Sequence, residues 1–171
     1  MMNPETDLKN RIKSGVAVDL ALIEQALARN LNPYYDLVRD IAGHVLFSGG
    51  KRLRPLLMVL SARLCGYFGD DDKNISVLFE YLHAATLIHD DLVDEAAMRR
   101  GRESAHLRYG NAQAVLTGDF LLARSLSLAA RTGIPKVIEV IAKITEDMSQ
   151  GEIQQMANKG RLELSEAEYM D

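Results

Sequence analysis

The chain carries the stretch Leu82-His83-Ala84-Ala85-Thr86-Leu87-Ile88-His89-Asp90-Asp91-Leu92-Val93-Asp94, in which a helical apolar pattern ends in three aspartates. The pattern predicts one largely buried helix from about Asn74 to Glu95. At about 100° per residue, Asp90 and Asp94 are about 40° apart around the helix axis. The two carboxylates are therefore expected on one face of a buried helix.

Apolar stripes on both sides of this stretch predict further helices. They cover residues 20–27, 37–45, Leu56 to about Phe68, Asn111 to about Arg131, and Pro135 to about Lys159. Asn111 is a candidate N-cap, and Gly69-Asp70-Asp71-Asp72 is a candidate acidic turn. Because β-branched residues are scattered and no Asn-Gly or Asp-Gly turn joins alternating segments, strands are not expected. The fold class predicted is all-α.

Composition limits the size of the fold and the classes of partner. With 171 residues, of which 47% are apolar and 26% charged, one core and one domain are expected. A net charge of −4 argues against a nucleic-acid binder. The start of the chain lacks a signal peptide pattern, and no apolar run reaches the ~18 residues of a membrane span. The lone Cys65 is expected in the core, and these features favour a soluble cytoplasmic protein.

The last residues of the sequence contain the start signal of a helix. Ser165 and Glu168 form a capping box, although the sequence stops at Asp171. A helix of fewer than two turns does not offset its nucleation cost. Residues 1–171 are therefore expected to be the N-terminal part of one domain that continues beyond residue 171. In that case the apolar faces of the helices at 74–95 and 111–131 would be exposed.

The aspartate face is a candidate metal site. Two carboxylates at this spacing repel each other, and solvent or a bound cation relieves the repulsion. Ligands that are all oxygen suit Mg²⁺, which also takes phosphate oxygens and water. The alternative is a solvated acidic helix end extended by Glu95. His83 lies two turns before Asp90 on the same line, and it is either a core histidine or a donor to an anion.

Cations cluster on both sides of this helix in the sequence. Six of the 20 Lys and Arg residues fall in two short loops, Lys51, Arg52 and Arg54 in one and Arg99, Arg100 and Arg102 in the other. The guanidinium fork binds phosphate oxygens in pairs, and Gly49-Gly50 lets backbone N–H groups approach an anion. The alternative is two ordinary solvated basic loops. Taken with the aspartates, they predict a site for phosphorylated ligands bridged by Mg²⁺.

These blocks resemble the polyprenyl synthetase family. The resemblance rests on Ser48-Gly49-Gly50-Lys51-Arg52-Leu53-Arg54-Pro55, the aspartate stretch and Arg99-Arg100-Gly101, and it extends from about Leu20 to the end through Gly118-Asp119 and Gly151-Glu152. It implies the helical isoprenoid-synthase fold, truncated to its N-terminal half. It also implies a prenyltransferase that condenses isopentenyl diphosphate with an allylic diphosphate, and a homodimer.

The resemblance assigns roles to individual residues. The diphosphate of isopentenyl diphosphate would be held by Lys51, Arg54, His83 and Arg100, and the allylic diphosphate by Arg99. Asp90 and Asp94 would ligate Mg²⁺ with Asp91 in support. No residue is assigned covalent or acid–base catalysis. Glu152 and Gln155 would lie near the allylic site or form an exposed helical pair.

Three further expectations follow from the resemblance. The family carries a second Asp-rich motif that nothing after Asp94 repeats, so this chain would hold half of the metal site and be inactive alone. Ala85 and Thr86 are small where a bulky aromatic would stop a growing chain, which favours a long product. The rivals are a cyclase or head-to-head synthase on the same fold, and a non-catalytic partner subunit or binding module.

Overall fold

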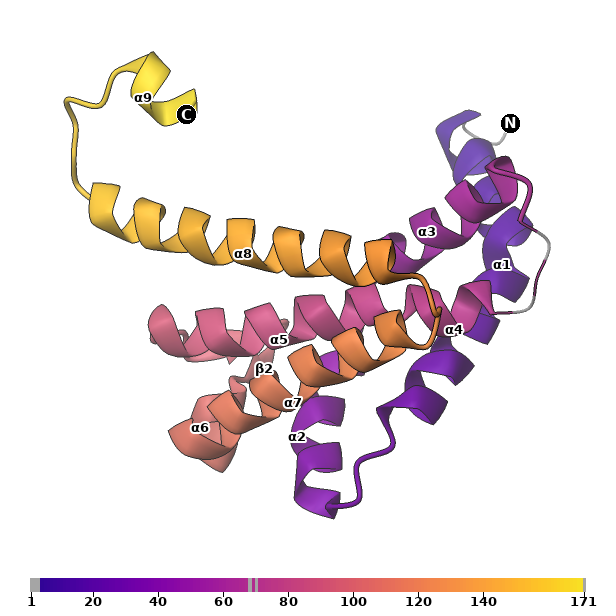
Figure 1. Ribbon diagram of the computed structural model, residues 1–171, viewed down its shortest axis with the longest axis horizontal. Coiled ribbons are helices and arrows are strands. Elements are labelled where there is room, and N and C mark those ends of the chain that lie inside the picture. Colours follow the sequence, from indigo (N-terminus) through magenta and orange to yellow (C-terminus); the bar gives the residue numbers. More distant parts are fainter. Residues whose placement is uncertain (1–3, 68, 70, 171) are drawn as a thin grey trace.

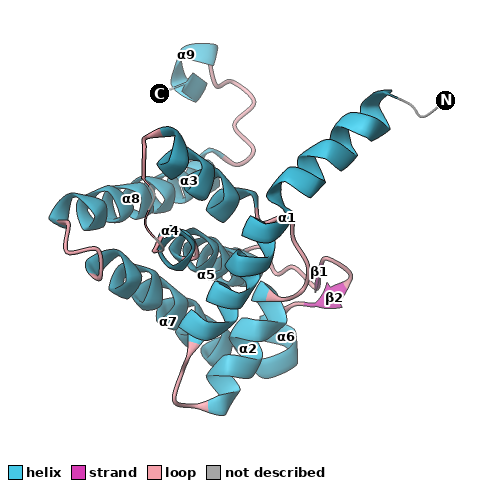
Figure 2. Ribbon diagram, turned by 90° about the vertical axis from the view of Figure 1, so that its right-hand side faces the viewer, coloured by secondary structure: helices cyan, strands magenta, loops and turns pink. Residues whose placement is uncertain are grey.

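A computed structural model of the chain describes residues 4–67, 69 and 71–170, so Phe68 and Asp70 of the predicted helix end and acidic turn lie outside the described residues. Helices dominate, which confirms the all-α prediction (Figures 1 and 2). The elements are α1 Pro4–Leu31, α2 Asp36–Leu46, α3 Leu53–Leu64, α4 Asp72–Ser76, α5 Leu78–Val93, β1 Met98–Arg99, β2 Arg102–Glu103, α6 Ala105–Tyr109, α7 Asn111–Ala130, α8 Pro135–Asn158 and α9 Glu166–Met170.

Helix α5 is the centre of the fold. It packs along α7, and α2, α3 and α6 contact its other sides (Figure 1). Tyr81 and Ile88 of α5 and Leu121 of α7 are at most 1% exposed, and the Tyr81 hydroxyl donates a hydrogen bond to the Leu27 carbonyl at the end of α1. Burial on most sides explains why α5 has few polar residues before its last turn.

The predicted helix from Asn74 to Glu95 is divided in two. Helix α4 ends at Ser76, Val77 forms a turn, and α5 ends at Val93 with Asp94 as its C-cap. The Ser76 hydroxyl bonds the Lys73 carbonyl at 2.9 Å, which is the local competition with helix hydrogen bonds that serine offers. Because α4 packs against α1 and α3, tertiary contacts decide where the break falls.

A short hairpin replaces the predicted basic loop. Met98 pairs with Glu103 and Arg99 with Arg102 in an antiparallel ribbon. Its two turn residues, Arg100 and Gly101, have φ of 50° and 77°. Positive φ at both central positions is the pattern of a type I′ hairpin turn, usually signalled by Asn-Gly. An arginine in the first position hides this signal from the sequence.

Three local predictions have different outcomes. Asn111 does not cap α7, because it is already the first helical residue and Gly110, with φ of 97°, takes the N-cap position. Cys65 is exposed at the C-cap of α3, so its expected burial is wrong. The capping box before α9 is confirmed, since the Ser165 N–H bonds the Glu168 carboxylate at 2.9 Å and the Glu168 N–H bonds the Ser165 hydroxyl at 3.3 Å.

Exposed apolar side chains lie mainly outside α5 and α7, contrary to expectation. Each of those helices has one large exposed apolar residue, Val93 and Leu116. Helix α8 buries only Ile141 and exposes Ile138, Val140, Ile144, Met148, Ile153 and Met156. Figure 1 shows α8 extending beyond the helices beside it toward α9. No helix among the described residues has the length and apolar composition needed to cross a lipid bilayer.

Candidate functional site

The aspartate face forms the end of α5. Asp90 is half-buried in the last turn, and Asp94 is exposed at the C-cap. Burial raises the pKa of Asp90 above its ordinary value, and the negative charges of Glu152, Asp94 and Asp91 add to that effect, while Arg99 opposes it. A carboxylate in this setting gains from a nearby cation, because the cation offsets both the desolvation and the repulsion.

Asp91 has a different environment from its neighbours. It is 2% exposed, and both of its carboxylate oxygens accept hydrogen bonds from Arg99 Nε, at 2.7 and 2.8 Å. Arg99 Nη2 lies 2.6 Å from Oδ1 of the same carboxylate. This bond is the largest cause of the raised pKa of Arg99. The described geometry therefore gives Asp91 an arginine partner of its own.

Arg52 of the first basic loop is structural. Its side chain is 6% exposed, and it pairs with Glu24 of α1 at 2.6 Å and with Glu80 of α5 at 3.2 Å. Its Nη2 also donates to the Leu46 carbonyl at 2.8 Å. With φ of 51°, Arg52 turns the chain between α2 and α3 and fastens this turn to the core.

Three of the other predicted cations, Arg54, Arg99 and Arg100, lie around His83. The pKa of His83 falls to about 4, first through burial and then through the positive charges of Arg54, Arg100 and Arg99. Arg100 Nη1 donates to the Gly49 carbonyl, so the hairpin carrying Arg99 and Arg100 contacts the glycine loop. Neutral imidazole has one N–H to donate at pH 7. The structure therefore brings together the histidine and three arginines from distant parts of the chain.

Lys51 is not drawn into this cluster. Its side chain is exposed, and among the described residues it makes no hydrogen bond or ion pair. Gly50, next to it, is close to the guanidinium groups instead, because a Cβ on Gly50 would lie 3.3 Å from both Arg100 Nη1 and Arg52 Nη1. Gly50 thus leaves room for two packed arginines, while Lys51 is an exposed charge beside them.

Helix α8 brings two further polar residues, Glu152 and Gln155, to the aspartate face. Glu152 raises the pKa of Asp90, and a hollow of about 580 Å³ is lined by Glu152, Gln155 and Asp94. In the sequence these two residues were an i, i+3 polar pair, equally consistent with an exposed surface. Only the course of α8 past the end of α5 distinguishes the two interpretations.

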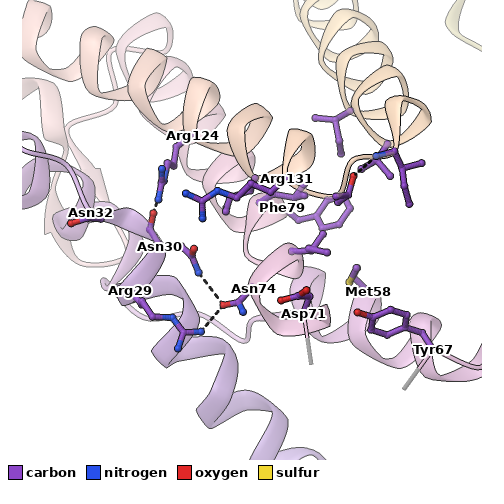
Figure 3. A pocket seen from close by; sticks show the side chains of 17 residues that line it. Arg29, Asn30, Asn32, Met58, Tyr67, Asp71, Asn74, Phe79, Arg124 and Arg131 are labelled. Carbon is purple, nitrogen blue, oxygen red and sulfur yellow. Dashed lines mark hydrogen bonds between the residues drawn. The ribbon is translucent and has the colours of Figure 1, made fainter. Parts of the chain in front are cut away.

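A larger cavity lies at the other end of α5. It has a volume of about 850 Å³ and lies beside Leu78 and Phe79, in the first turn of α5. Figure 3 shows Arg29, Asn30 and Asn74 on one side, where Arg29 and Asn30 both bond the Asn74 side-chain oxygen. Its apolar lining includes Met58, Leu128, Val137 and Ile141. Neither Ala85 nor Thr86 lines it.

The aspartate face has ligands suited to Mg²⁺. Among the described residues, no group of three or more His, Cys, Asp or Glu side chains could hold a metal ion. Asp90 and Asp94 provide two carboxylates, which leaves the remaining positions to water and phosphate oxygens, as Mg²⁺ prefers. Burial first, and then the charge of Glu152, raises the pKa of Asp90, so a cation at this face would stabilise the Asp90 carboxylate.

Comparison with known proteins places this geometry in context. The profile of the polyprenyl synthetase family matches residues 35–171. The octaprenyl diphosphate synthase of Escherichia coli (strain K12) is 38% identical over 160 residues, which cover 94% of this chain and 50% of that protein. The heptaprenyl diphosphate synthase component 2 of Geobacillus stearothermophilus is 39% identical over 145 residues, covering 85% and 45%. The chain spans about half the length of these curated relatives.

A solved structure confirms the predicted fold. The crystal structure of a polyprenyl synthase from Caulobacter crescentus CB15, complexed with calcium and isoprenyl diphosphate, superimposes with a TM-score of 0.86 at 37% identity. The match covers 94% of this chain and 49% of that chain. The helical arrangement is therefore that of the isoprenoid synthases, over about half of the complete fold.

Proposed function

Because the chain belongs to the polyprenyl synthetase family, we propose that it is the N-terminal half of a Mg²⁺-dependent prenyltransferase domain. The reaction joins isopentenyl diphosphate to an allylic diphosphate and gives a long trans-polyprenyl diphosphate. The long-chain synthases among the relatives support this product class. The small residues Ala85 and Thr86, upstream of Asp90, support it as well.

One observation carries the proposal: cations from two loops gather beside one acidic face. Arg99, held by Asp91, acts on both Asp90 and His83, while Arg54 and Arg100 act on His83 of the same helix. We infer that these donors are shared between two diphosphates. We assign Asp90 and Asp94 to Mg²⁺, Arg99 to the allylic diphosphate, and Arg54, His83, Arg100 and Lys51 to isopentenyl diphosphate.

These residues would act by electrostatic preorganisation. Mg²⁺, when bound, neutralises charge on the departing diphosphate. Arg99 donates hydrogen bonds to the same group as the allylic C–O bond breaks, and Arg54 and Arg100 hold the second substrate so that its double bond can form the new C–C bond. A proton is then lost from the condensed product. His83 donates from its neutral ring without adding another cation to the cluster.

The relatives also support a second candidate function. The name heptaprenyl diphosphate synthase component 2 describes one component of a multi-component enzyme, so this protein would act with a different partner chain, as a catalytic component or as a non-catalytic subunit. The aspartates and arginines of the site favour the catalytic role, since a purely structural subunit would not need them. If the complete protein forms an active homodimer alone, the two-component candidate is excluded.

The test compares two arginine variants of the complete synthase. Arg54→Ala should raise the Michaelis constant for isopentenyl diphosphate, and Arg99→Ala that for the allylic diphosphate, each by about tenfold or more, because each loses charge-assisted bonds of ~1.5–3 kcal/mol. Arg161→Ala, which removes an exposed arginine between α8 and α9, is the matched control and should change neither constant. Equal effects of both site variants on both constants would contradict the assignment.

A further inference from the structure

The Asp91 carboxylate differs from those of Asp90 and Asp94 in that the hairpin after α5 supplies its partner, Arg99. It is 2% exposed, and one guanidinium occupies both of its oxygens through Nε and Nη2. Oδ1 accepts from both nitrogens and Oδ2 accepts from Nε, so the ion pair with Arg99 uses most of the acceptor capacity of this carboxylate. Its neighbour Ala96 closes the turn after α5 by donating its N–H to the Asp91 carbonyl at 2.9 Å.

Arg99 retains donors after pairing with Asp91. A guanidinium has five N–H groups, and the contacts with Asp91 use those on Nε and one side of Nη2. Of the remaining three, one on Nη2 and one on Nη1 point outward side by side, which is the paired geometry that phosphate oxygens accept. The Arg99 side chain is 31% exposed, so this edge can reach a ligand.

The hairpin that carries Arg99 is itself fastened at its open end. The Ser104 N–H donates to the Ala97 carbonyl at 3.0 Å, and His44 of α2 contacts the Glu103 carbonyl at 2.7 Å. The backbone of Arg99 is therefore fixed by the ribbon. Its long side chain would still sample several rotamers, and the bond to Asp91 removes that freedom.

We propose that Asp91 is a positioning residue that aims the free edge of Arg99 at the allylic diphosphate and takes no part in binding Mg²⁺. The inference rests on the proposed function and deepens it. The three neighbouring aspartates then have two different roles. Asp90 and Asp94 bind the metal, while Asp91 preorganises Arg99 on the hairpin that follows.

The experiment is steady-state kinetics on the complete synthase with geranyl diphosphate as the allylic probe. Asp91→Asn keeps the shape but places an amide NH₂ group against the Arg99 donors. We expect the Michaelis constant for geranyl diphosphate to rise about tenfold or more and the constant for isopentenyl diphosphate to change less than about twofold. The Mg²⁺ concentration for half-maximal activity should rise far less than in Asp90→Asn. Asp90→Asn should raise that Mg²⁺ concentration.

A double-mutant cycle separates action through Arg99 from any other role. In an Arg99→Gln background, Asp91→Asn should change the constant for geranyl diphosphate by less than about twofold, because the residue it positions is already gone. The inference would be overturned if the fold-changes of Asp91→Asn and Arg99→Gln multiplied in the double variant. It would also be overturned if Asp91→Asn raised the Mg²⁺ requirement as much as Asp90→Asn does. A wild-type synthase without condensation activity would instead refute the proposed function.

A matched control accounts for lost stability. Asp19 is also buried, and its carboxylate is held by both terminal nitrogens of Arg63, far from the site. Asp19→Asn should lower the melting temperature as Asp91→Asn does, without changing either Michaelis constant. If Asp19→Asn raised the constant for geranyl diphosphate to the same extent, the effect of Asp91→Asn would be general destabilisation, and the positioning role would be rejected.

Discussion

His89 of α5 fills the space left by Gly118 of α7. A Cβ atom on Gly118 would lie 2.3 Å from His89 Nε2 and 2.7 Å from its Cδ2. The ring is held there by the Val115 carbonyl at 3.2 Å, and the Asp119 carboxylate lies 3.5 Å away. Since α5 and α7 form the central contact of the fold, this notch sets how closely the helix carrying the aspartates approaches its neighbour.

Gly118→Ala should therefore destabilise the protein. The new methyl group forces the ring of His89 out of the notch, and overpacking of this kind costs ~1–3 kcal/mol. Chemical denaturation followed by circular dichroism measures the change. Gly15→Ala is the control, because Gly15 lies inside α1 with nothing within 4 Å of an added Cβ. That variant should be more stable by ~0.5–1 kcal/mol. Equal stability of Gly118→Ala and wild type would show that the contact is loose.

Activity of the complete synthase should require Mg²⁺ and both outer aspartates. Asp90→Ala or Asp94→Ala should lower turnover by about 100-fold or more, since removing a ligand weakens charge stabilisation worth several kcal/mol. Because the pKa of Asp90 is raised, protons should compete with Mg²⁺, and the Mg²⁺ requirement should increase as pH falls. Asp147→Ala, which removes an exposed carboxylate of α8, is the control. Near-normal turnover in either site variant would contradict the metal assignment.

His83 should make folding stability pH-dependent. Its pKa falls from 6.5 to about 4 on folding. Between these values the unfolded chain binds the proton and the folded chain does not, so the free energy of unfolding decreases as pH falls through this window. His83→Gln should flatten that part of the profile relative to wild type. A titration of the His83 ring by NMR tests the cause directly, and a pKa near 6.5 in the folded chain would contradict it.

Thr86→Phe should shorten the product of the complete synthase. Thr86 is half-buried on the same side of α5 as His83. Its hydroxyl donates a hydrogen bond to the His83 carbonyl at 2.9 Å. A phenyl ring there would obstruct the path along α5. The structure changes the expectation for Ala85, which is 3% exposed, because Ala85→Phe should mainly overpack the core. Mass analysis of the products measures their chain length. An unchanged product distribution with Thr86→Phe would show that this residue does not control product length.

The sequence predicted the helices that carry the site better than it predicted their connections. The apolar period of α5 and the shared face of Asp90 and Asp94 follow from local helix geometry, so both could be predicted from the sequence. The break at Val77 depends on how α4 packs against α1 and α3, which no local pattern records. The hairpin was missed because its turn uses Arg100 at positive φ in place of asparagine.

Charge counting found the cation clusters but could not assign each cation. Arg52 and Arg54 are two residues apart in one basic loop, yet Arg52 is buried between Glu24 and Glu80 while Arg54 is exposed. The partners of Arg52 lie 28 residues away on either side, so only the fold shows that it is structural. The same holds for Asp91, whose residue type and spacing are indistinguishable from those of the metal candidates.

The 171-residue chain should be inactive alone and should self-associate. We expect activity to require metal ligands on both sides of the departing diphosphate, and among the described residues we assign only Asp90 and Asp94 to the metal. Self-association should occur through α8, because this helix exposes Val140, Ile144 and Ile153 and buries only one residue. Ile144→Glu combined with Ile153→Lys should keep the net charge and weaken association. Lys136→Glu combined with Glu139→Lys, on the polar face of the same helix, should leave association unchanged.

Light scattering on the purified chain measures self-association, and a condensation assay at high concentration measures activity. A monodisperse monomer would refute the self-association, and Mg²⁺-dependent turnover above background would refute the need for a further set of ligands.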